Sequence, residues 1–220
     1  MKKIKAMFLA ISALVMVSCS DPDYPAEGHF LSDIHRIGSI EASHVGGYIL
    51  GGVEPLKCQV IFHPSYVTTR DQRSEIWAAY GDMSYSRRPD LVEKAAKISA
   101  KLIDCRLKSV DVIALDDFDA SHPASSSLAD LCTYTFGRVL IPEWIADGYA
   151  GRMPSIYNTG ITGKLSDPEW DKALMTRGDD LSLLLDFSKG PDAPCRFRVE
   201  ITDGFGLKTT CETLFNKYQK

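Results

Sequence analysis

The sequence has one long apolar run, and that run lies at the very start of the chain. No stretch after residue 18 is long and apolar enough to cross a bilayer, for which a helix needs about 20 apolar residues. Dense basic stretches are lacking as well, because Arg87-Arg88 is only a pair. Nucleic-acid binding depends on clustered Lys and Arg, so the sequence argues against a nucleic-acid partner. A basic patch for anionic lipid headgroups is missing for the same reason.

Catalytic and metal-binding motifs of fixed spacing are also lacking. The G-x-S-x-G elbow is absent, and Lys101 stands two residues after Ser99, where the S-x-x-K motif needs three. The five histidines show no H-E-x-x-H spacing, and no C-x-x-C pair occurs that would indicate zinc. Carboxylates are too numerous to single out a glycosidase pair, whose chemistry depends on separation in space. The sequence therefore predicts no catalytic residue and no cofactor.

What the amino terminus does contain is the layout of a secretory signal peptide. Positive charges come first, an uncharged apolar run covers residues 6–17, and the small Ser18 stands just before Cys19. The apolar run is too short for a spanning helix. We therefore expect residues 1–18 to be removed on export. Their removal takes away three lysines and no acidic residue, which changes the net charge from −4 to −7.

The residues Met16-Val17-Ser18-Cys19 are similar to the lipobox of bacterial lipoproteins, although Met16 replaces the usual Leu. The resemblance implies that the Cys19 thiol receives a diacylglyceryl group and that Cys19 becomes the first residue of the mature chain. Several acyl chains hold a protein on a membrane, because each buried CH₂ adds about 0.8 kcal/mol. The alternative is an ordinary signal peptide followed by a chance cysteine.

Residues 19–28 are predicted to form a flexible tether, since prolines and Gly28 discourage regular structure there. The acidic run Ser20-Asp21-Pro22-Asp23 resembles the surface-export signal of Bacteroidetes lipoproteins. The resemblance implies the outer face of the outer membrane. The alternative is a solvated acidic linker on a protein that faces the periplasm.

Residues 29–220 are expected to form a single, mainly β domain. Alternation of apolar residues predicts a strand over 196–202, followed by a turn at 203–206 and a returning strand over 207–214. Further strands are predicted over 108–115, around 60–62 and over 181–187. Several strands separated by turns indicate an immunoglobulin-like or related Greek-key β-sandwich with one or two short helices. A barrel is the alternative.

A helix is the competing prediction for residues 91–103. Asp90 would cap it, Glu93 would close the capping box, and apolar residues from Leu91 to Leu102 follow helical spacing. Residues 97–107 also alternate in places, so part of this segment has the pattern of a strand.

Five cysteines follow Cys19, an odd number, so at least one thiol is free or paired with another chain. The predicted hairpin suggests a disulfide between Cys195 and Cys211. The alternative is that all five are buried as small reduced side chains. The five are Cys58, Cys105, Cys132, Cys195 and Cys211.

A motif in the middle of the chain carries a second resemblance. Asp117-Phe118-Asp119, His122-Pro123-Ala124, Ser126-Ser127-Leu128 and Asp130-Leu131 follow one another over about fifteen residues. Together with the lipobox they resemble an uncharacterised family of Bacteroides-type lipoproteins with the pattern DFD-x-x-HPAG-SSL-x-DLF. Here Ser125 replaces the Gly and Cys132 replaces the Phe. The resemblance implies a lipoprotein and adds nothing on chemistry.

Read from the residues alone, the same motif predicts a turn. A strand ends, Asp119 and His122 close the turn, Pro123 fixes φ, and a helix of one or two turns follows at 127–130. The aspartates could instead offer oxygen ligands to calcium, but three residues supply only part of a shell of six to eight. This weak calcium candidate consists of Asp116, Asp117 and Asp119.

Aromatic residues near Glu143 and Asp147 suggest a ligand-binding surface. Exposed rings cover the apolar face of a sugar while carboxylates accept hydrogen bonds from its hydroxyls. The alternative is that the rings belong to the core, where large aromatics mostly lie. The residues are Trp144, Tyr149, Tyr157 and Trp170.

These observations favour a lipid-anchored envelope protein without catalytic activity, which binds a glycan or a protein or takes part in an assembly. The rival is an envelope hydrolase that acts on a glycan or a peptide with a site assembled from distant residues.

Overall fold

The computed structural model describes residues 28–31, 33–45, 56–83, 102–155, 159–177 and 181–215. The signal peptide, Cys19 and Tyr157 lie outside these residues, as does most of the helix predicted over 91–103. The described part is mainly β, with two sheets and two α-helices, which confirms the predicted class of fold. The finer assignment to an immunoglobulin-like or Greek-key arrangement stays a prediction.

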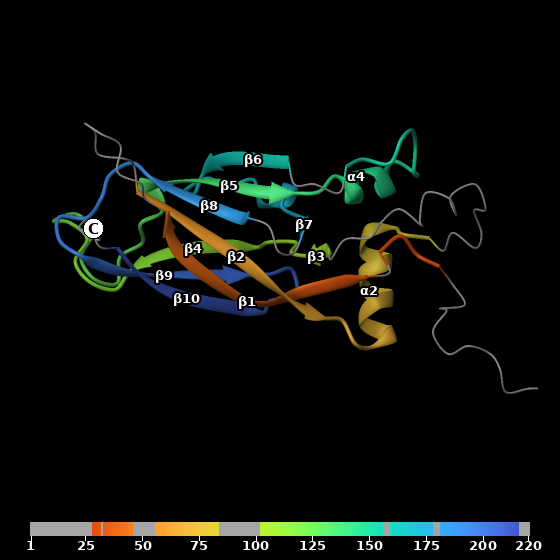
Figure 1. The fold of residues 1–220 in the computed structure, drawn as a ribbon, viewed down its shortest axis with the longest axis horizontal. Coiled ribbons are helices and arrows are strands. Elements are labelled where there is room, and N and C mark those ends of the chain that lie inside the picture. Colours follow the sequence, from red (N-terminus) through yellow and green to blue (C-terminus); the bar gives the residue numbers. More distant parts are fainter. Residues whose placement is uncertain are drawn as a thin grey trace, which may run out of the picture.

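The larger sheet has seven strands in the order β6-β5-β8-β2-β1-β3-β7, and the smaller sheet has three in the order β10-β9-β4 (Figure 1). Within the described residues, β1 and β3 form a parallel pair, whereas every other pair is antiparallel. The bounds of the strands in the larger sheet are β1 (Ile34–Val45), β2 (Leu56–Tyr66), β3 (Leu102–Asp104), β5 (Cys132–Arg138), β6 (Thr159–Lys164), β7 (Met175–Arg177) and β8 (Leu181–Phe187). Those of the smaller sheet are β4 (Ser109–Ala114), β9 (Cys195–Thr202) and β10 (Lys208–Phe215).

The main core lies between the two sheets. In β2 and β9 every second side chain is buried, which is the period expected of strands with one face against a core. Phe187 of β8 meets Phe197 of β9 across the core, with ring centroids 5.4 Å apart. The strands predicted at 108–115, 181–187, 196–202 and 207–214 are therefore confirmed within one or two residues.

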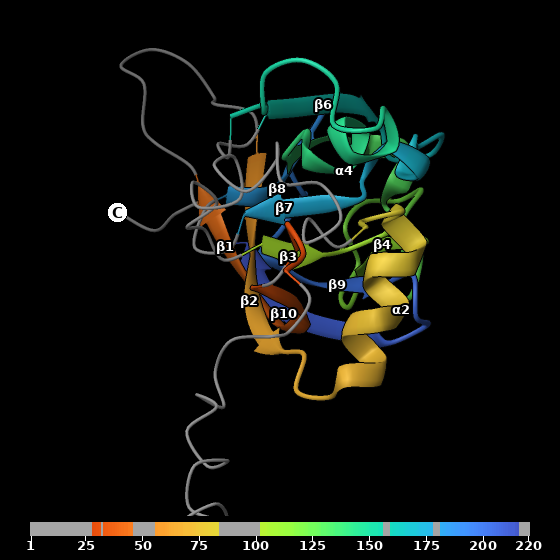
Figure 2. The ribbon, with the colours of Figure 1, turned by 90° about the vertical axis from the view of Figure 1, so that its right-hand side faces the viewer.

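Two α-helices, α2 (Arg70–Tyr80) and α4 (Ile141–Ala146), lie at one end of the sandwich, which Figure 2 views face-on. A capping box between Thr69 and Gln72 starts α2, and Gly81, with φ of 69°, ends it in the left-handed conformation. Ile76 and Tyr80 form its buried face. Helix α2 was not predicted, although Thr69, Gln72 and Gly81 form a capping box and a glycine C-cap that the sequence contains. No helix in the described part of the chain is long and apolar enough to span a membrane.

A second core cluster fills the space between these helices and the sheet. It contains Phe30 and Leu31, near the start of the described residues, together with Ile76, Trp144 and Met175. Leu102 also belongs to it as part of β3, so the helix predicted over 91–103 does not extend through its last two residues. The end of that segment is a strand because Leu102 pairs with Ile34 of β1.

The hairpin of β9 and β10 does not bring Cys195 and Cys211 together, so the predicted disulfide is wrong. Cys195 is opposite Phe215, and Cys211 is opposite Val199. The two cysteines are thus four residues apart along the ladder, about 13 Å at the usual rise of a strand, beyond the reach of a disulfide. All five described cysteines are free, and four of them are buried as the alternative expected, whereas Cys211 is half-buried.

Candidate functional site

Two loops meet at the end of the sandwich that lies opposite the helices (Figure 1). One connects β4 to β5 and contains the DFD and HPA residues, and the other connects β8 to β9. Ser127 forms a bridge with Ile113, and the 3-10 helix η3 (Ala129–Leu131) leads into β5. The short helix predicted after the motif is present as this single turn.

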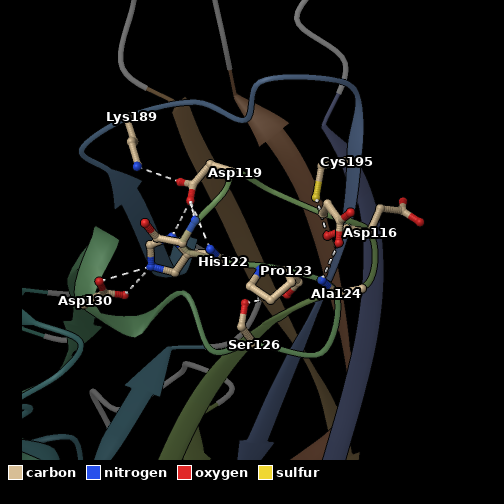
Figure 3. Close-up of polar contacts among 11 residues, drawn as sticks. Asp116, Asp119, His122, Pro123, Ala124, Ser126, Asp130, Lys189 and Cys195 are labelled. Atoms are coloured by element: carbon tan, nitrogen blue, oxygen red, sulfur yellow. Dashed lines mark hydrogen bonds and ion pairs between the residues drawn. The ribbon is translucent and has the colours of Figure 1, made fainter.

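Hydrogen bonds from the backbone to aspartates shape the first loop (Figure 3). Asp119 Oδ1 accepts from the backbone N–H of Ser121 at 2.7 Å and of His122 at 3.0 Å, as predicted for a turn that this pair closes. Asp117 Oδ1 accepts from the backbone N–H of Ala124 at 2.9 Å. Ser125, with φ of 74°, adopts the left-handed conformation that favours glycine. Ser125 is the position at which the resembling lipoproteins carry Gly.

His122 lies between two carboxylates at the centre of this loop (Figure 3). Its Nδ1 is 2.9 Å from Asp119 Oδ1, and its Nε2 is 3.2 Å from both carboxylate oxygens of Asp130. The hydrogen bond with Asp119 is the main reason why the pKa of His122 is raised. Both ring nitrogens donate only in the imidazolium form, so this environment stabilises the charged ring. Neither nitrogen is left to accept a proton or bind a metal while these contacts hold.

Lys189 joins the second loop to the first. Its Nζ is 2.6 Å from Asp119 Oδ2. This contact and the hydrogen bond with His122 hold the pKa of Asp119 well below its usual range. Asp119 thus faces a lysine, an imidazolium and two backbone N–H groups, so it is an anchoring carboxylate inside the loop.

Asp116 faces a different cation, Arg196 at the start of β9. The guanidinium donates to both carboxylate oxygens at 3.0 and 2.8 Å, and the backbone N–H of Arg196 adds a third bond. These bonds lower the pKa of Asp116 to about 2. The carboxylates of Asp116, Asp117 and Asp119 therefore serve three separate partners and do not converge, which overturns the weak calcium candidate. Over the described ranges, no group of three or more His, Cys, Asp or Glu side chains is placed to hold a metal ion.

An open cleft of about 360 Å³ lies between the two loops. The exposed apolar side chains of its lining are those of Ala120, Pro123 and Ala193, and the exposed acidic ones are those of Asp117 and Asp192. Its lining residues are Asp117, Phe118, Asp119, Ala120, Pro123, Asp192 and Ala193. The cleft thus combines an apolar surface with a negative rim, a combination that suits the stem and head of a basic side chain.

The three described members of the aromatic surface predicted from the sequence, Trp144, Tyr149 and Trp170, are all buried, and the fourth, Tyr157, lies outside the described residues. Trp144 and Tyr149 are 6% and 3% exposed in the second core cluster, and both contact Phe30. Trp170 is 8% exposed and packs on Tyr134 with ring centroids 4.4 Å apart. These three residues belong to the core, which was the alternative to an exposed ligand-binding surface.

Two buried polar clusters near the helices were not foreseen. Asp104 is fully buried and accepts hydrogen bonds from the Tyr80 hydroxyl at 2.7 Å and from both Nε and Nη2 of Arg106. Burial raises the pKa of Asp104 despite these donors. Asp82 accepts from Tyr149 at 2.9 Å and from the backbone N–H of Leu31 at 2.9 Å. Apart from Arg106, these partners are distant in the sequence, so no local pattern indicates them.

Asp104 connects α2 to β3 through Tyr80, and Asp82, which lies just after α2, connects that part of the chain to Tyr149 and Leu31. They are therefore structural links, and the loop end with its cleft is the candidate functional site. Comparison of the chain with family models, with curated proteins and with solved structures found no match.

Proposed function

We propose that this chain is a lipid-anchored protein of the cell envelope that binds a protein partner through its loop end and catalyses no reaction. The observation that carries the proposal is the cleft between the two loops. The imidazole of His122, which adjoins the cleft, is held by a carboxylate at each of its two nitrogens. A loop fixed in this way presents a preformed surface, which lowers the entropic cost of binding.

The chemistry of the cleft narrows the partner. A sugar would need exposed aromatic rings, and the rings proposed for this purpose lie in the core. Exposed Asp117 and Asp192, beside the exposed side chains of Pro123 and Ala193, fit a lysine or arginine side chain of another protein. The anchor is proposed from the lipobox, with Cys19 as the acylated residue.

Cross-linking in the intact envelope tests the binding site. A photo-reactive residue replaces Ala193 on the rim of the cleft, and the same residue replaces the exposed Thr162 in β6 as a control. We expect a discrete adduct only from the position of Ala193, and we expect Asp192→Lys to abolish it. Asp111→Lys, the same change of charge on the exposed face of β4, should leave the adduct intact.

Three outcomes would overturn the proposal. Equal adducts from both positions, or an adduct that survives Asp192→Lys, would mean that the cleft does not select the partner. Release of product from purified envelope glycan or peptide by the wild-type chain, lost in His122→Gln, would instead establish the hydrolase.

The anchor has its own test. Mass spectrometry of the amino-terminal peptide from membrane fractions should show an acylated Cys19, and Cys19→Ala should move the chain to the soluble fraction. An unmodified Cys19 in membrane material would contradict the anchor.

A further inference from the structure

The folded part of the chain begins deep in the end that carries the helices. Phe30 and Leu31, which stand near the start of the described residues, are both buried. Figure 2 looks directly at this end of the domain. The backbone of Leu31 is held on both sides, because its N–H donates to Asp82 and its C=O accepts from Trp77 Nε1 at 3.0 Å. The point at which the chain leaves the domain toward Cys19 is therefore fixed at this end.

The two loops that line the cleft lie at the other end of the long axis (Figure 1). Strand β2 runs between the two ends and has 11 residues, which correspond to about 36 Å at the rise of a strand. From Cys19 to residue 28 there are nine residues, and nine residues span at most about 32 Å even when fully extended. A domain standing with its cleft on the membrane would need a longer connection than the sequence provides.

Exposed apolar side chains gather at the same end as the exit point. Among the described residues four large apolar side chains are at least half exposed. Tyr66 (74%) ends β2 where the chain turns into α2, Met83 (56%) follows α2, and Leu207 (51%) borders the β9–β10 turn. That turn adjoins α2 through Phe205, whose ring lies 3.4 Å from the guanidinium carbon of Arg36, while Arg36 pairs with Glu75 of α2. Leu214 alone lies toward the opposite end of β10.

We infer that the helix end of the domain, defined by Tyr66, Met83 and Leu207, rests against the bilayer that holds the lipid anchor, so that the cleft faces away from that membrane. The inference rests on the proposed acylation of Cys19. Exposed tyrosine and aliphatic side chains suit the headgroup region, where an apolar body meets a polar boundary. A partner of the cleft then approaches from the aqueous side or from a facing structure.

Fluorescence energy transfer on the full-length acylated chain tests this orientation. The chain is reconstituted in vesicles of phosphatidylethanolamine and phosphatidylglycerol that contain an acceptor-labelled lipid, and a donor dye is attached at Met83→Cys or at Ala193→Cys. The native thiols react slowly, since burial raises the pKa of Cys58 to about 12 and that of Cys211 to about 11. We expect several-fold greater transfer from the Met83→Cys dye than from the Ala193→Cys dye.

A matched pair of variants separates apolar contact from tethering alone. Replacing Tyr66 and Leu207 by serine should weaken the transfer from the Met83→Cys dye. Leu214→Ser makes the same chemical change as Leu207→Ser at the far end of the domain, and it should leave that transfer unchanged. Equal transfer from the two dyes on acylated chain would overturn the orientation and leave the anchor standing. Mass spectrometry that finds Cys19 unmodified would overturn the proposed function itself, so the two failures are distinguishable.

Discussion

Replacing Ser125 by glycine should stabilise the protein. Ser125 has φ of 74°, a conformation that costs a residue with a Cβ about 1–2 kcal/mol relative to glycine. Glycine also stabilises the unfolded chain by about 0.4–1 kcal/mol, because it gives that chain more conformational freedom, and this reduces the gain. The net gain is about 0.5–1 kcal/mol, or roughly 1–4 °C in Tm for a chain of this size. The backbone N–H of residue 125, which donates to Ala114 O at 2.8 Å, is kept.

Two control variants isolate the backbone as the cause. Ser125→Ala keeps the Cβ, so its free energy of unfolding should stay within about 0.5 kcal/mol of the wild type. Ser121→Gly lies in the same loop, where φ is not positive, and should be neutral or slightly destabilising. Urea unfolding of all three variants at one pH provides the comparison. A destabilised Ser125→Gly, or an equal gain from Ser125→Ala, would refute the argument from φ.

Three further results are expected. Because the pKa of His122 is raised in the folded protein, the stability that its charge provides is complete below about pH 6.5, the pKa of an unfolded histidine, and is lost as pH rises through the raised value. Urea unfolding from pH 5 to 9 should show this decline, and the decline should be smaller in His122→Gln. Tyr80→Phe removes a hydrogen-bond donor to buried Asp104 and should lower the free energy of unfolding by about 1–3 kcal/mol in the same assay. A decrease no larger than that caused by an exposed Tyr-to-Phe change would contradict the buried hydrogen bond. Alkylation of the denatured, unreduced protein should modify both Cys195 and Cys211, and a tryptic peptide pair linked through them would show that the register of the hairpin is different.

The strands were predictable because their evidence is local. Alternation over 196–202 and the glycine turn after it are contained in a dozen residues, and the structure places β9, the turn and β10 there. The turn at Asp119 and His122 was predictable for the same reason, since an aspartate bonds to the backbone two and three residues ahead.

The disulfide and the exposure of the aromatic rings were mispredicted although the sequence contained evidence on both. A hairpin joins residues equally distant from its turn, and Cys195 and Cys211 are ten and six residues from Phe205, the centre of this register. The sequence analysis left Trp144 as either an exposed ring or a core residue, and the spacing of Ile141, Trp144 and Ile145 is that of the buried face of a helix, which α4 has. That spacing was the readable evidence for burial. The contact between Asp130 and His122 needs the fold of the loop itself.

The buried beginning of the domain affects how the chain reaches its final state. Phe30 is made among the first residues, but the rings that cover it, Trp144 and Tyr149, follow more than a hundred residues later. During synthesis from the amino terminus, the leading segment therefore stays uncovered until most of the domain has been made. The segment around Phe30 is thus one of the first parts of the domain to be made and one of the last to be covered by its packing partners.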